Sequence, residues 1–387
     1  MKKKVLLVLS YVLVAALACG ATLGIVYFGT GYSKLNELEN LIFLRFAGES
    51  DQTAMEDAAA YAMIDALGDR WSYYIPAADF DTFQDNSNNA YVGIGVSVTA
   101  LEDGTGFLVA KVEPGGPADQ GGMEVGDIII QVEDQSVEGL TVSELSRRIK
   151  GEENTSVTLT VLRDGEGISL YLTRKRMETA VAKGSMLNEH VGLVTIVNFD
   201  DRCADETISA IEQVLDQGAD MLLFDVRNNP GGYVEELCRV LDYLLPEGDL
   251  IRMVGTDGKE ETKTSDGASV KVPMAVLVNE DSYSAAELFA ADLREYGAAK
   301  IFGAQTCGKG FYQNLFRFQD GSAVGLSIGR YYTSKGENLE GVGLTPDVEV
   351  KLNDTEKTQL LAGLLEAEND PQLQEALSYL MDKVVRP

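Results

Sequence analysis

Residues 273–313 restrict the fold of this chain more than any other segment, because they predict a strand, a helix and a second strand in direct succession. Residues 274–278 form a short apolar run bounded by a proline and by polar residues, which indicates a buried strand. Residues 285–296 carry leucine and phenylalanine at helical spacing, and Gly297 follows as a C-cap residue would. Residues 300–302 predict the next strand. The segment therefore indicates an α/β unit with a serine at its first strand-to-helix junction.

Ser284, at that junction, has two interpretations. Ser284 and Glu287 form the capping-box pattern S-x-x-E, in which the serine hydroxyl accepts from a backbone N–H of the first helical turn. Most serines in this pattern only cap a helix. Alternatively, the hydroxyl is a nucleophile, and the N–H groups and dipole of the helix start stabilise the oxyanion that forms on the attacked carbonyl.

A serine nucleophile needs a base, and the chain offers two candidates. Its single histidine, His190, precedes a strand-like run and is better explained as a turn residue than as part of a catalytic triad. A lysine serves as a base when burial lowers its pKa, so that the neutral amine is available. Lys309 lies between two glycines, and its neighbours Cys307, Phe311 and Tyr312 could desolvate it.

Two motifs of this segment resemble the signature of the carboxyl-terminal processing peptidases, which are serine proteases with a Ser-Lys dyad. The first is N-x-x-S-x-S-A-x-E, beginning at Asn279, and the second is T-x-G-K-G-x-x-Q, ending at Gln313. The resemblance implies that Ser284 is the nucleophile, that Lys309 is the base and that Gln313 orients the lysine. It also implies a crotonase/ClpP-like α/β protease core.

Three residues depart from the family's pattern. Tyr283 stands where a small residue is common, Ala286 where serine is common, and Cys307 where phenylalanine is common. None of these differences removes a catalytic group. A cysteine beside the base does introduce a risk of oxidation at the site.

Residues 228–232 read Asn-Asn-Pro-Gly-Gly, which by itself is a tight turn between a strand and a helix. Turn glycines are commonplace, so a purely structural role is the default interpretation. The segment resembles the family's D-x-R-x-N-P-G-G sequence, whose glycine amide contributes to the oxyanion hole. The resemblance therefore implies an oxyanion hole made of the amide of Gly231 or Gly232 and the amide of Ala285.

Two further segments extend the resemblance over nearly all of the chain beyond the N-terminal apolar run. Residues 68–76 read G-D-R-W-S-Y-Y-I-P and resemble the family's L-D-P-Y-S-x-Y-L segment. An aromatic turn that packs a helix against a sheet is the alternative interpretation. Residues 327–350 resemble the family's closing segment, Y-x-T-x-x-G followed by G-(I/L)-x-P-D.

Residues 91–176 predict a PDZ domain. A G-x-G loop formed by Val92, Gly93, Ile94 and Gly95 precedes P-A-x-x-G-G-M-x-x-G-D-x-I-x-x-V at PDZ spacing. Free N–H groups in such a loop accept a terminal carboxylate, while the peptide adds as a strand to the sheet edge. The sequence therefore predicts capture of protein C-termini at this loop. A PDZ domain that only packs against the catalytic core is the minor alternative.

The N-terminus predicts attachment to the cytoplasmic membrane. Three lysines precede an uncharged run over residues 5–33, and about 20 apolar residues suffice to cross a bilayer. The lysines favour the cytoplasmic side, which places the catalytic part outside the bacterial cytoplasmic membrane. We expect an uncleaved signal-anchor with a single pass. A signal peptide cleaved after residues 16–18, giving a secreted protein, and a lipid on Cys19 are weaker alternatives.

Charge and residue usage exclude several partners. The formal net charge of -29 argues against nucleic acid, because phosphate binding needs a basic surface. The one histidine and four cysteines have no spacing typical of a metal site, so we expect neither a metal nor another cofactor. Cys203 and Cys238 could form a disulfide, which the sequence leaves open.

The sequence as a whole predicts an α/β multidomain protein in five parts. These are a cytoplasmic tip with a signal-anchor helix (1–33), an N-terminal helical region (34–88), a PDZ domain (89–176), a Ser-Lys protease core (177–350) and a C-terminal helical segment (351–387). The expected function is that of a serine endopeptidase that binds protein C-termini through the PDZ domain and cleaves peptide bonds.

The alternative function is a non-catalytic PDZ scaffold or peptide-binding protein on a degenerate protease fold. Joint retention of Ser284, Lys309 and Gln313 favours the enzyme. The expected partners are proteins or peptides with accessible C-termini and the cytoplasmic membrane. The physiological substrate, the oligomeric state and the effect of the PDZ domain on activity are not determined by the sequence.

Overall fold

The computed structural model describes residues 33–101 and 103–385, and the chain divides into two compact units, residues 1–68 and 69–387. The predicted signal-anchor therefore lies, except for its last residue, outside the described residues. Among the residues that are described, we find no helix with the length and apolar character needed to cross a membrane.

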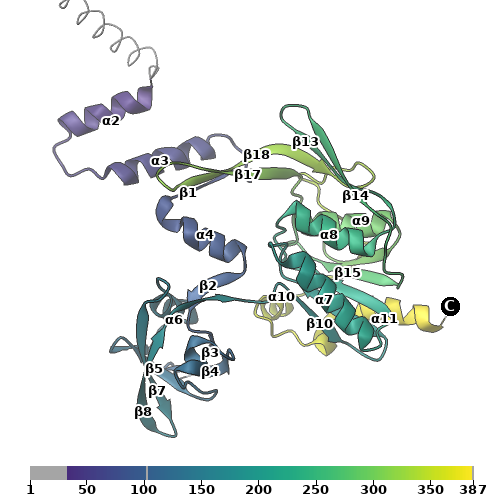
Figure 1. The fold of residues 1–387 in the computed structure, drawn as a ribbon, viewed down its shortest axis with the longest axis horizontal. Helices are drawn as coiled ribbons and strands as arrows, with labels where there is room; N and C mark the ends of the chain where they lie inside the picture. Colours follow the sequence, from purple (N-terminus) through teal and green to yellow (C-terminus); the bar gives the residue numbers. More distant parts are fainter. Residues whose placement is uncertain (1–32, 102, 386–387) are drawn as a thin grey trace, which may run out of the picture. The chain divides into compact units, whose positions relative to one another are not determined.

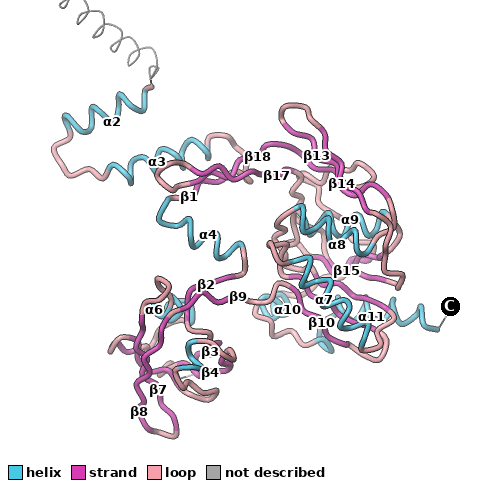
Figure 2. The backbone as a smooth tube through the Cα atoms, in the orientation of Figure 1, coloured by secondary structure: helices cyan, strands magenta, loops and turns pink. Residues whose placement is uncertain are grey.

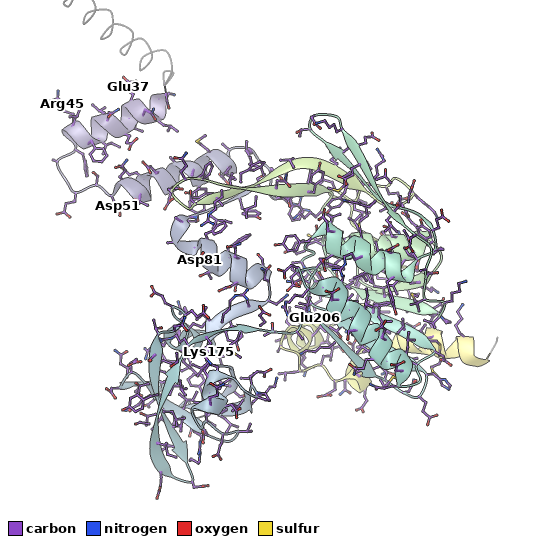
Figure 3. All side chains as sticks on the ribbon, in the orientation of Figure 1. Glu37, Arg45, Asp51, Asp81, Lys175 and Glu206 are labelled. Carbon is purple, nitrogen blue, oxygen red and sulfur yellow. The ribbon has the colours of Figure 1, made fainter. Side chains whose placement is uncertain are left out.

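The described part of the first unit contains two α-helices, in the predicted N-terminal helical region. They are α2 (Lys34–Arg45) and α3 (Gln52–Asp65). Asp51, labelled in Figure 3, caps α3 by accepting a hydrogen bond from Ala54 N at 3.1 Å. Neither of these two helices has a buried residue.

The second unit begins with a segment that leads towards the predicted PDZ domain. It comprises the strand β1 (Tyr73–Ile75), the 3₁₀ helix η1 (Ala77–Asp79) and the helix α4 (Phe80–Ser87). A two-stranded ribbon follows, in which β2 (Ala90–Gly93) pairs antiparallel with β9 (Lys175–Glu178). The ribbon brackets residues 94–174, so the chain enters and leaves this domain at one place (Figure 2).

The domain between the ribbon strands is rich in β-structure (Figure 2). Its strands are β3 (Val96–Ala100), β4 (Phe107–Val112), β5 (Ile128–Val132), β6 (Gln135–Ser136), β7 (Ser156–Arg163) and β8 (Glu166–Thr173). Its helices are α5 (Pro117–Gln120) and α6 (Val142–Ile149). Val157, Leu159 and Val161 alternate along β7 and are fully buried, as in a strand with one face in the core.

A six-stranded sheet forms the centre of the predicted protease core (Figure 1). Its strands lie in the order β10 (Ala182–Met186), β11 (Val191–Ile196), β12 (Met221–Asp225), β15 (Met274–Val278), β16 (Ala299–Gly303) and β19 (Val348–Glu349). All neighbours pair in parallel except β10 and β11. Parallel strands need crossover connections, and three helices lie in them: α7 (Cys203–Asp216), α8 (Val234–Leu244) and α9 (Ala285–Glu295).

Successive residues of β12 point to opposite faces of this sheet, and each face has its own core. Leu222 and Phe224 belong to the larger cluster, which includes side chains of α7, α8 and α9. Leu223 belongs to a second cluster with Leu373 of α11 (Pro371–Val385). The continuous apolar runs that predicted these strands therefore reflect burial on both faces.

A second, five-stranded sheet carries the segments that meet at the candidate site. Its order is β1, β18 (Ala323–Tyr332), β13 (Gly248–Gly255) and β14 (Glu260–Ser265), and β17 (Phe311–Arg317) also pairs with β18. Strand β17 directly follows the turn that contains Lys309, residues 306–310, which we call the lysine turn. Strand β1 closely follows Trp71. Because both strands pair with β18, two segments far apart in sequence come together.

The C-terminal segment is helical, as predicted, and its elements are α10 (Asp354–Leu361), the 3₁₀ helix η2 (Ala367–Asn369) and α11. The buried guanidinium of Arg227 forms ion pairs with Asp225 at 2.6 Å and with Asp370 at 2.7 Å. Asp370 directly precedes α11, so this triad attaches the helix to the end of β12. The fold agrees with the expected combination of N-terminal helices, a β-rich PDZ domain and an α/β core.

Candidate active site

Ser284 lies at the sharp turn between the end of β15 and the start of α9. Its backbone has φ 61° and ψ -121°, which is an unfavourable region for a residue with a side chain. Its N–H donates to Oε2 of Glu287 at 2.9 Å, so one half of the expected capping box is present. A strained strand-to-helix turn of this kind is also how nucleophilic serines are exposed in other hydrolase folds.

The Ser284 hydroxyl is hydrogen-bonded to the phenol of Tyr331, a buried residue of β18. The Tyr331 hydroxyl in turn donates to the carbonyl oxygen of Lys309. Burial raises the pKa of Tyr331 well above its usual value, so the phenol stays protonated.

Glu287 joins the serine turn to the lysine turn. Its side chain has no exposed surface and accepts four hydrogen bonds. One carboxylate oxygen accepts from the N–H groups of Ser284 and Lys309, at 2.9 Å each, and the other accepts from Thr306 Oγ1 and from Gly308 N. Burial raises the pKa of Glu287, and the hydrogen bonds oppose that shift because they favour the carboxylate.

The amine of Lys309 lies beneath two aromatic rings. Its Nζ is 5.1 Å from the ring centroid of Trp71 and 5.9 Å from that of Tyr283. Burial lowers the pKa of Lys309 below its usual value. No hydrogen bond joins Lys309 Nζ to Ser284 Oγ among the described residues, and such bonds are often loose before substrate binds.

The cover over Lys309 does not come from the neighbours that the sequence suggested. We expected Cys307, Phe311 and Tyr312 to shield the amine, but the rings within reach belong to Trp71 and Tyr283. The helix α9 and the strand β1 place these two residues, which are far from the lysine in sequence.

Gln313 does not contact the amine of Lys309. Its Nε2 donates to Ser327 Oγ at 3.1 Å and to Phe311 O at 3.2 Å. Ser327 is also hydrogen-bonded to Asp69. The negative charge of Asp69 acts on Lys309 and favours the protonated amine. Within the described residues, therefore, the connection between Gln313 and the lysine environment runs through Ser327 and Asp69.

Gly231 packs directly against the serine turn. Its φ is 87°, and a Cβ at this position would lie 2.7 Å from Ser284 Cβ and 2.9 Å from Ala285 N. Only glycine fits such a contact. The N–H of Gly231 donates to Asn229 Oδ1 at 2.8 Å. By contrast, the N–H groups of Gly232 and Ala285 have no acceptor within the described parts of the chain.

The predicted peptide-binding loop lines a cavity of about 300 Å³ in the β-rich domain. Gly93, Ile94 and Gly95 contribute to its wall, together with Leu145 and Ile149 of α6. Val92 does not line this cavity, because successive residues of β2 face opposite sides and its neighbours Tyr91 and Gly93 face the cavity instead. Three of the four residues assigned to this loop thus face the cavity between β3 and α6.

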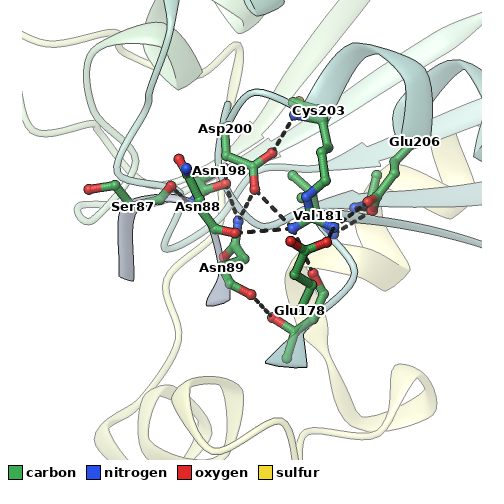
Figure 4. A network of polar contacts seen from close by, with 12 residues as sticks. Ser87, Asn88, Asn89, Glu178, Val181, Asn198, Asp200, Cys203 and Glu206 are labelled. Atoms are coloured by element: carbon green, nitrogen blue, oxygen red, sulfur yellow. Dashed lines mark hydrogen bonds and ion pairs between the residues drawn. The ribbon is translucent and has the colours of Figure 1, made fainter. Parts of the chain in front are cut away.

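A polar network at the base of the ribbon was not predicted from sequence (Figure 4). Arg202 forms ion pairs with the buried Asp200 at 3.1 Å and with Glu206 at 2.7 Å. Its guanidinium also donates to the carbonyl oxygens of Asn88 and Thr179, which flank the two ribbon strands.

The same network extends to the turn formed by residues 228–232, which we call the glycine turn. Asn89 donates to Asp200 Oδ2 at 2.9 Å, and Asp200 directly follows Phe199. Phe199 N donates to the carbonyl oxygen of Gly231 at 2.8 Å, and a Cβ on Gly232 would lie 2.2 Å from the carbonyl oxygen of Phe199. The base of the ribbon and the glycine turn therefore share one short segment, residues 198–200.

His190 is remote from Ser284. It precedes β11, whereas Ser284 follows β15, and these strands run in parallel with β12 between them. The two residues therefore lie at opposite ends of the sheet. The His190 ring pairs with Asp220 at 3.2 Å in a partly exposed position, which fits the interpretation as a turn residue.

The cysteines of the described residues are free thiols, so Cys203 and Cys238 do not form a disulfide in this structure. Burial raises the pKa of Cys307, which keeps its thiol protonated and lowers its reactivity towards oxidants. Residues 33–101 and 103–385 contain no group of three or more His, Cys, Asp or Glu side chains suited to a metal ion.

Comparison with known proteins identifies both parts of the second unit. Peptidase family S41 matches residues 190–350, and the PDZ domain family matches residues 108–163. The chain is 31% identical over 333 residues to the carboxy-terminal processing protease CtpA of Bacillus subtilis (strain 168), a match that covers 85% of this chain and 71% of that protein.

Two further matches agree with this. The chain is 29% identical over 339 residues to a CtpA-like serine protease of Staphylococcus aureus (strain COL), which covers 86% of this chain and 67% of that protein. The solved structure of the photosystem II D1 C-terminal processing protease has the same fold, with a TM-score of 0.50 and 24% identity over 88% of this chain and 92% of that one. The chain therefore belongs to the carboxyl-terminal processing peptidases of family S41 and is a serine-type peptidase.

Proposed function

We propose that the chain is an endopeptidase that hydrolyses peptide bonds with Ser284 as nucleophile and Lys309 as base. The observation that carries this proposal is the shared oxygen of Glu287, which accepts from the backbone amides of both residues at 2.9 Å. One buried carboxylate thus fixes a strained serine turn and a partly desolvated lysine relative to each other. Among the residues that the structure describes, no other serine shares such a carboxylate with a lysine whose pKa is lowered.

The proposed reaction begins with transfer of the Ser284 proton to the neutral amine of Lys309, as the serine oxygen attacks the peptide carbonyl. The N–H groups of Gly232 and Ala285 receive the oxyanion, because they have no acceptor among the described residues, whereas the N–H of Gly231 is engaged by Asn229. Lys309 then protonates the leaving amine, and water hydrolyses the acyl-enzyme.

Tyr331 and Gln313 support this reaction without exchanging protons with the substrate. The Tyr331 phenol interacts with the Ser284 hydroxyl and donates to the Lys309 carbonyl, which holds the nucleophile and the base-bearing turn together. The Gln313 amide holds Ser327, which hydrogen-bonds the carboxylate of Asp69. Closure on a substrate would be needed to bring Gln313 to the lysine amine.

The PDZ domain, on this proposal, binds the C-terminus of the substrate in the cavity lined by Gly93, Ile94 and Gly95. The apolar side chains of Leu145 and Ile149 on the opposite wall favour an apolar last residue. The uncharged run over residues 5–33 anchors the protein in the cytoplasmic membrane, with its catalytic part on the outer side.

The test is cleavage of an unstructured protein with an apolar C-terminus, read by mass spectrometry of the fragments. The parent chain is compared with Ser284→Ala, Lys309→Ala and the control His190→Ala. We expect cleavage by the parent and by His190→Ala and none by the other two variants. Cleavage by Lys309→Ala at the parent's rate would rule out the dyad.

A further inference from the structure

The rings of Trp71 and Tyr283 lie together over the base. Their centroids are 6.1 Å apart, the rings are stacked with an interplanar angle of 27°, and Lys309 Nζ lies within 6 Å of both. Tyr283 directly precedes the nucleophile, and Trp71 belongs to the segment before β1. Nothing in the proposed proton transfers uses either ring, so their position needs a separate explanation.

Trp71 is held over the lysine turn by contacts at both its edge and its backbone. Its Nε1 donates to the carboxylate of Glu340 at 3.1 Å, and its backbone N–H donates to Asp69 Oδ1 at 3.1 Å. Glu340 in turn accepts from Gly310 N at 2.7 Å, next to the lysine. The tryptophan is thus attached to the same turn that it covers.

Arg70 adds a second attachment. Its guanidinium carbon lies 4.1 Å from the Trp71 ring centroid, and its Nη2 donates to the carbonyl oxygen of Gly308 at 2.9 Å. The Tyr283 backbone is fixed as well, because its N–H donates to the carbonyl oxygen of Asn229 at 3.1 Å. Both rings are therefore held by the walls of the site.

We propose that Trp71 and Tyr283 form an aromatic cover that excludes water from the Lys309 amine and so prepares this residue to act as the base for Ser284. The inference rests on the proposed function, and it makes Trp71 and Tyr283 positioning residues that act through the lysine. Neither residue touches the reacting atoms in this account.

The rings affect the pKa of Lys309 in two opposite ways. An aromatic face attracts a cation, which would favour the protonated lysine. Removal of water favours the neutral amine. Four other groups face the amine: Asp69, Glu340 and Glu287, whose carboxylates favour the ammonium form, and the Cys307 thiol, which is neutral because burial raises its pKa.

Burial nevertheless has the largest effect on the pKa of Lys309, and this pKa is lowered. Exclusion of water therefore outweighs the three carboxylates together. Loss of the cover would admit water and leave the carboxylates in place, so the lysine would hold its proton more tightly. Loss of a cation–π contact alone would have the opposite sign.

The experiment is an NMR titration of the full chain carrying ¹³C-labelled lysine, in a Ser284→Ala background that prevents self-cleavage. The Lys309 signal is assigned by its loss in Lys309→Met. We compare Trp71→Ala, Tyr283→Ala and the conservative variants Trp71→Phe and Tyr283→Phe. The control is Tyr379→Ala, which removes a ring that lies 5.0 Å from another lysine, Lys300.

We expect the Lys309 pKa to rise in Trp71→Ala and in Tyr283→Ala, to change less in the two phenylalanine variants, and to stay unchanged in Tyr379→Ala. In the catalytically intact background, Trp71→Ala should lower kcat/KM at neutral pH by about tenfold, as a rise of one pKa unit would, and recover at alkaline pH. The phenylalanine variants show whether an alanine result reflects lost folding, since they keep a ring in place.

A Lys309 pKa that falls, or does not move, in both alanine variants would overturn the aromatic cover. This titration does not depend on cleavage. If the parent chain cleaves peptides while Lys309 titrates in the ordinary lysine range, the Ser-Lys dyad stands and the aromatic cover is rejected. If the titrations are as expected but the chain has no activity, the aromatic cover stands and the proposed function is rejected.

Discussion

Ser284 and Lys309 donate their backbone N–H groups to the same oxygen atom, Oε2 of Glu287, at 2.9 Å each. The backbones that carry the nucleophile and the base are therefore held together by a single carboxylate with no exposed surface. We expected this glutamate to cap a helix, and it does so while also organising the lysine turn.

Replacement of this carboxylate should impair catalysis more than binding. Glu287→Gln puts an amide NH₂ group where one oxygen accepts two hydrogen bonds, which leaves buried donors unsatisfied at a cost of about 1–3 kcal/mol. We expect kcat to fall by about 10- to 100-fold with little change in KM. Steady-state kinetics beside Glu280→Gln, a partly exposed carboxylate, check this; equal losses in both variants would contradict it.

The glycine turn offers a steric test. Gly231→Ala places a Cβ 2.7 Å from Ser284 Cβ, so it should abolish cleavage or displace the serine. Gly258→Ala is the matched control, because Gly258 also has a positive φ, at 76°, but meets nothing within 4 Å. We expect Gly258→Ala to cost about 1 kcal/mol of stability and no activity. An active Gly231→Ala enzyme would show that the turn is not adjacent to the nucleophile.

Asp292 should make the protein less stable as the pH rises. This carboxyl group is buried in α9, burial raises its pKa to about 8, and its Oδ2 has no hydrogen-bond partner within the described residues. The group is protonated in the folded state and ionised in the unfolded state between its unfolded pKa, near 3.8, and about 8. Its stabilising contribution is thus complete below that window and is lost as pH rises through it.

Asp292→Asn keeps the oxygen that accepts from Ser334 N at 2.8 Å and removes the titration. We expect the variant to gain stability relative to the parent between pH 5 and pH 8, by on the order of 1 kcal/mol per pH unit at most. Denaturant unfolding in the Ser284→Ala background measures this difference. A difference that is constant with pH would show that Asp292 does not titrate in this range.

The network at the base of the ribbon should contribute to stability through its buried member. Arg202→Met leaves Asp200, whose side chain is 0% exposed, without its ion-pair partner, and we expect a loss of about 3 kcal/mol. Lys259→Met removes an exposed pair with Asp257 and should cost much less stability. Thermal unfolding of the two variants side by side tests the contrast, and similar losses would refute it.

Local patterns explain what could be predicted. The apolar run before Asn279, the helical spacing after Ser284 and the glycines around Lys309 each specify an element over a few residues, and the structure confirms the strand, the helix and the next strand. The PDZ sequence pattern is local in the same sense, and the PDZ domain family matches residues 108–163.

The remaining features depend on contacts between distant segments, which no local pattern reports. Trp71 reaches Lys309 only because β1 and β17 both pair with β18. Tyr331 of β18 reaches Ser284, which follows β15 of the other sheet. The choice between Gly231 and Gly232 depends on the side chain of Asn229, whose orientation in the turn the sequence does not give. Glu287 could have been noticed, because its capping pattern was read, but its contacts with the lysine turn could not.

The most direct test of the Ser-Lys assignment is the rate at which a phosphonate probe becomes attached to Ser284, followed by intact mass from pH 6 to pH 11. This rate reports activation of the nucleophile and needs no natural substrate. Because burial lowers the pKa of Lys309, we predict a rate that rises with pH and levels off below the usual lysine range near 10.4. Attachment should be absent in Ser284→Ala and much slower in Lys309→Ala. The same rate and pH profile in Lys309→Ala, or attachment at another residue, would contradict the account.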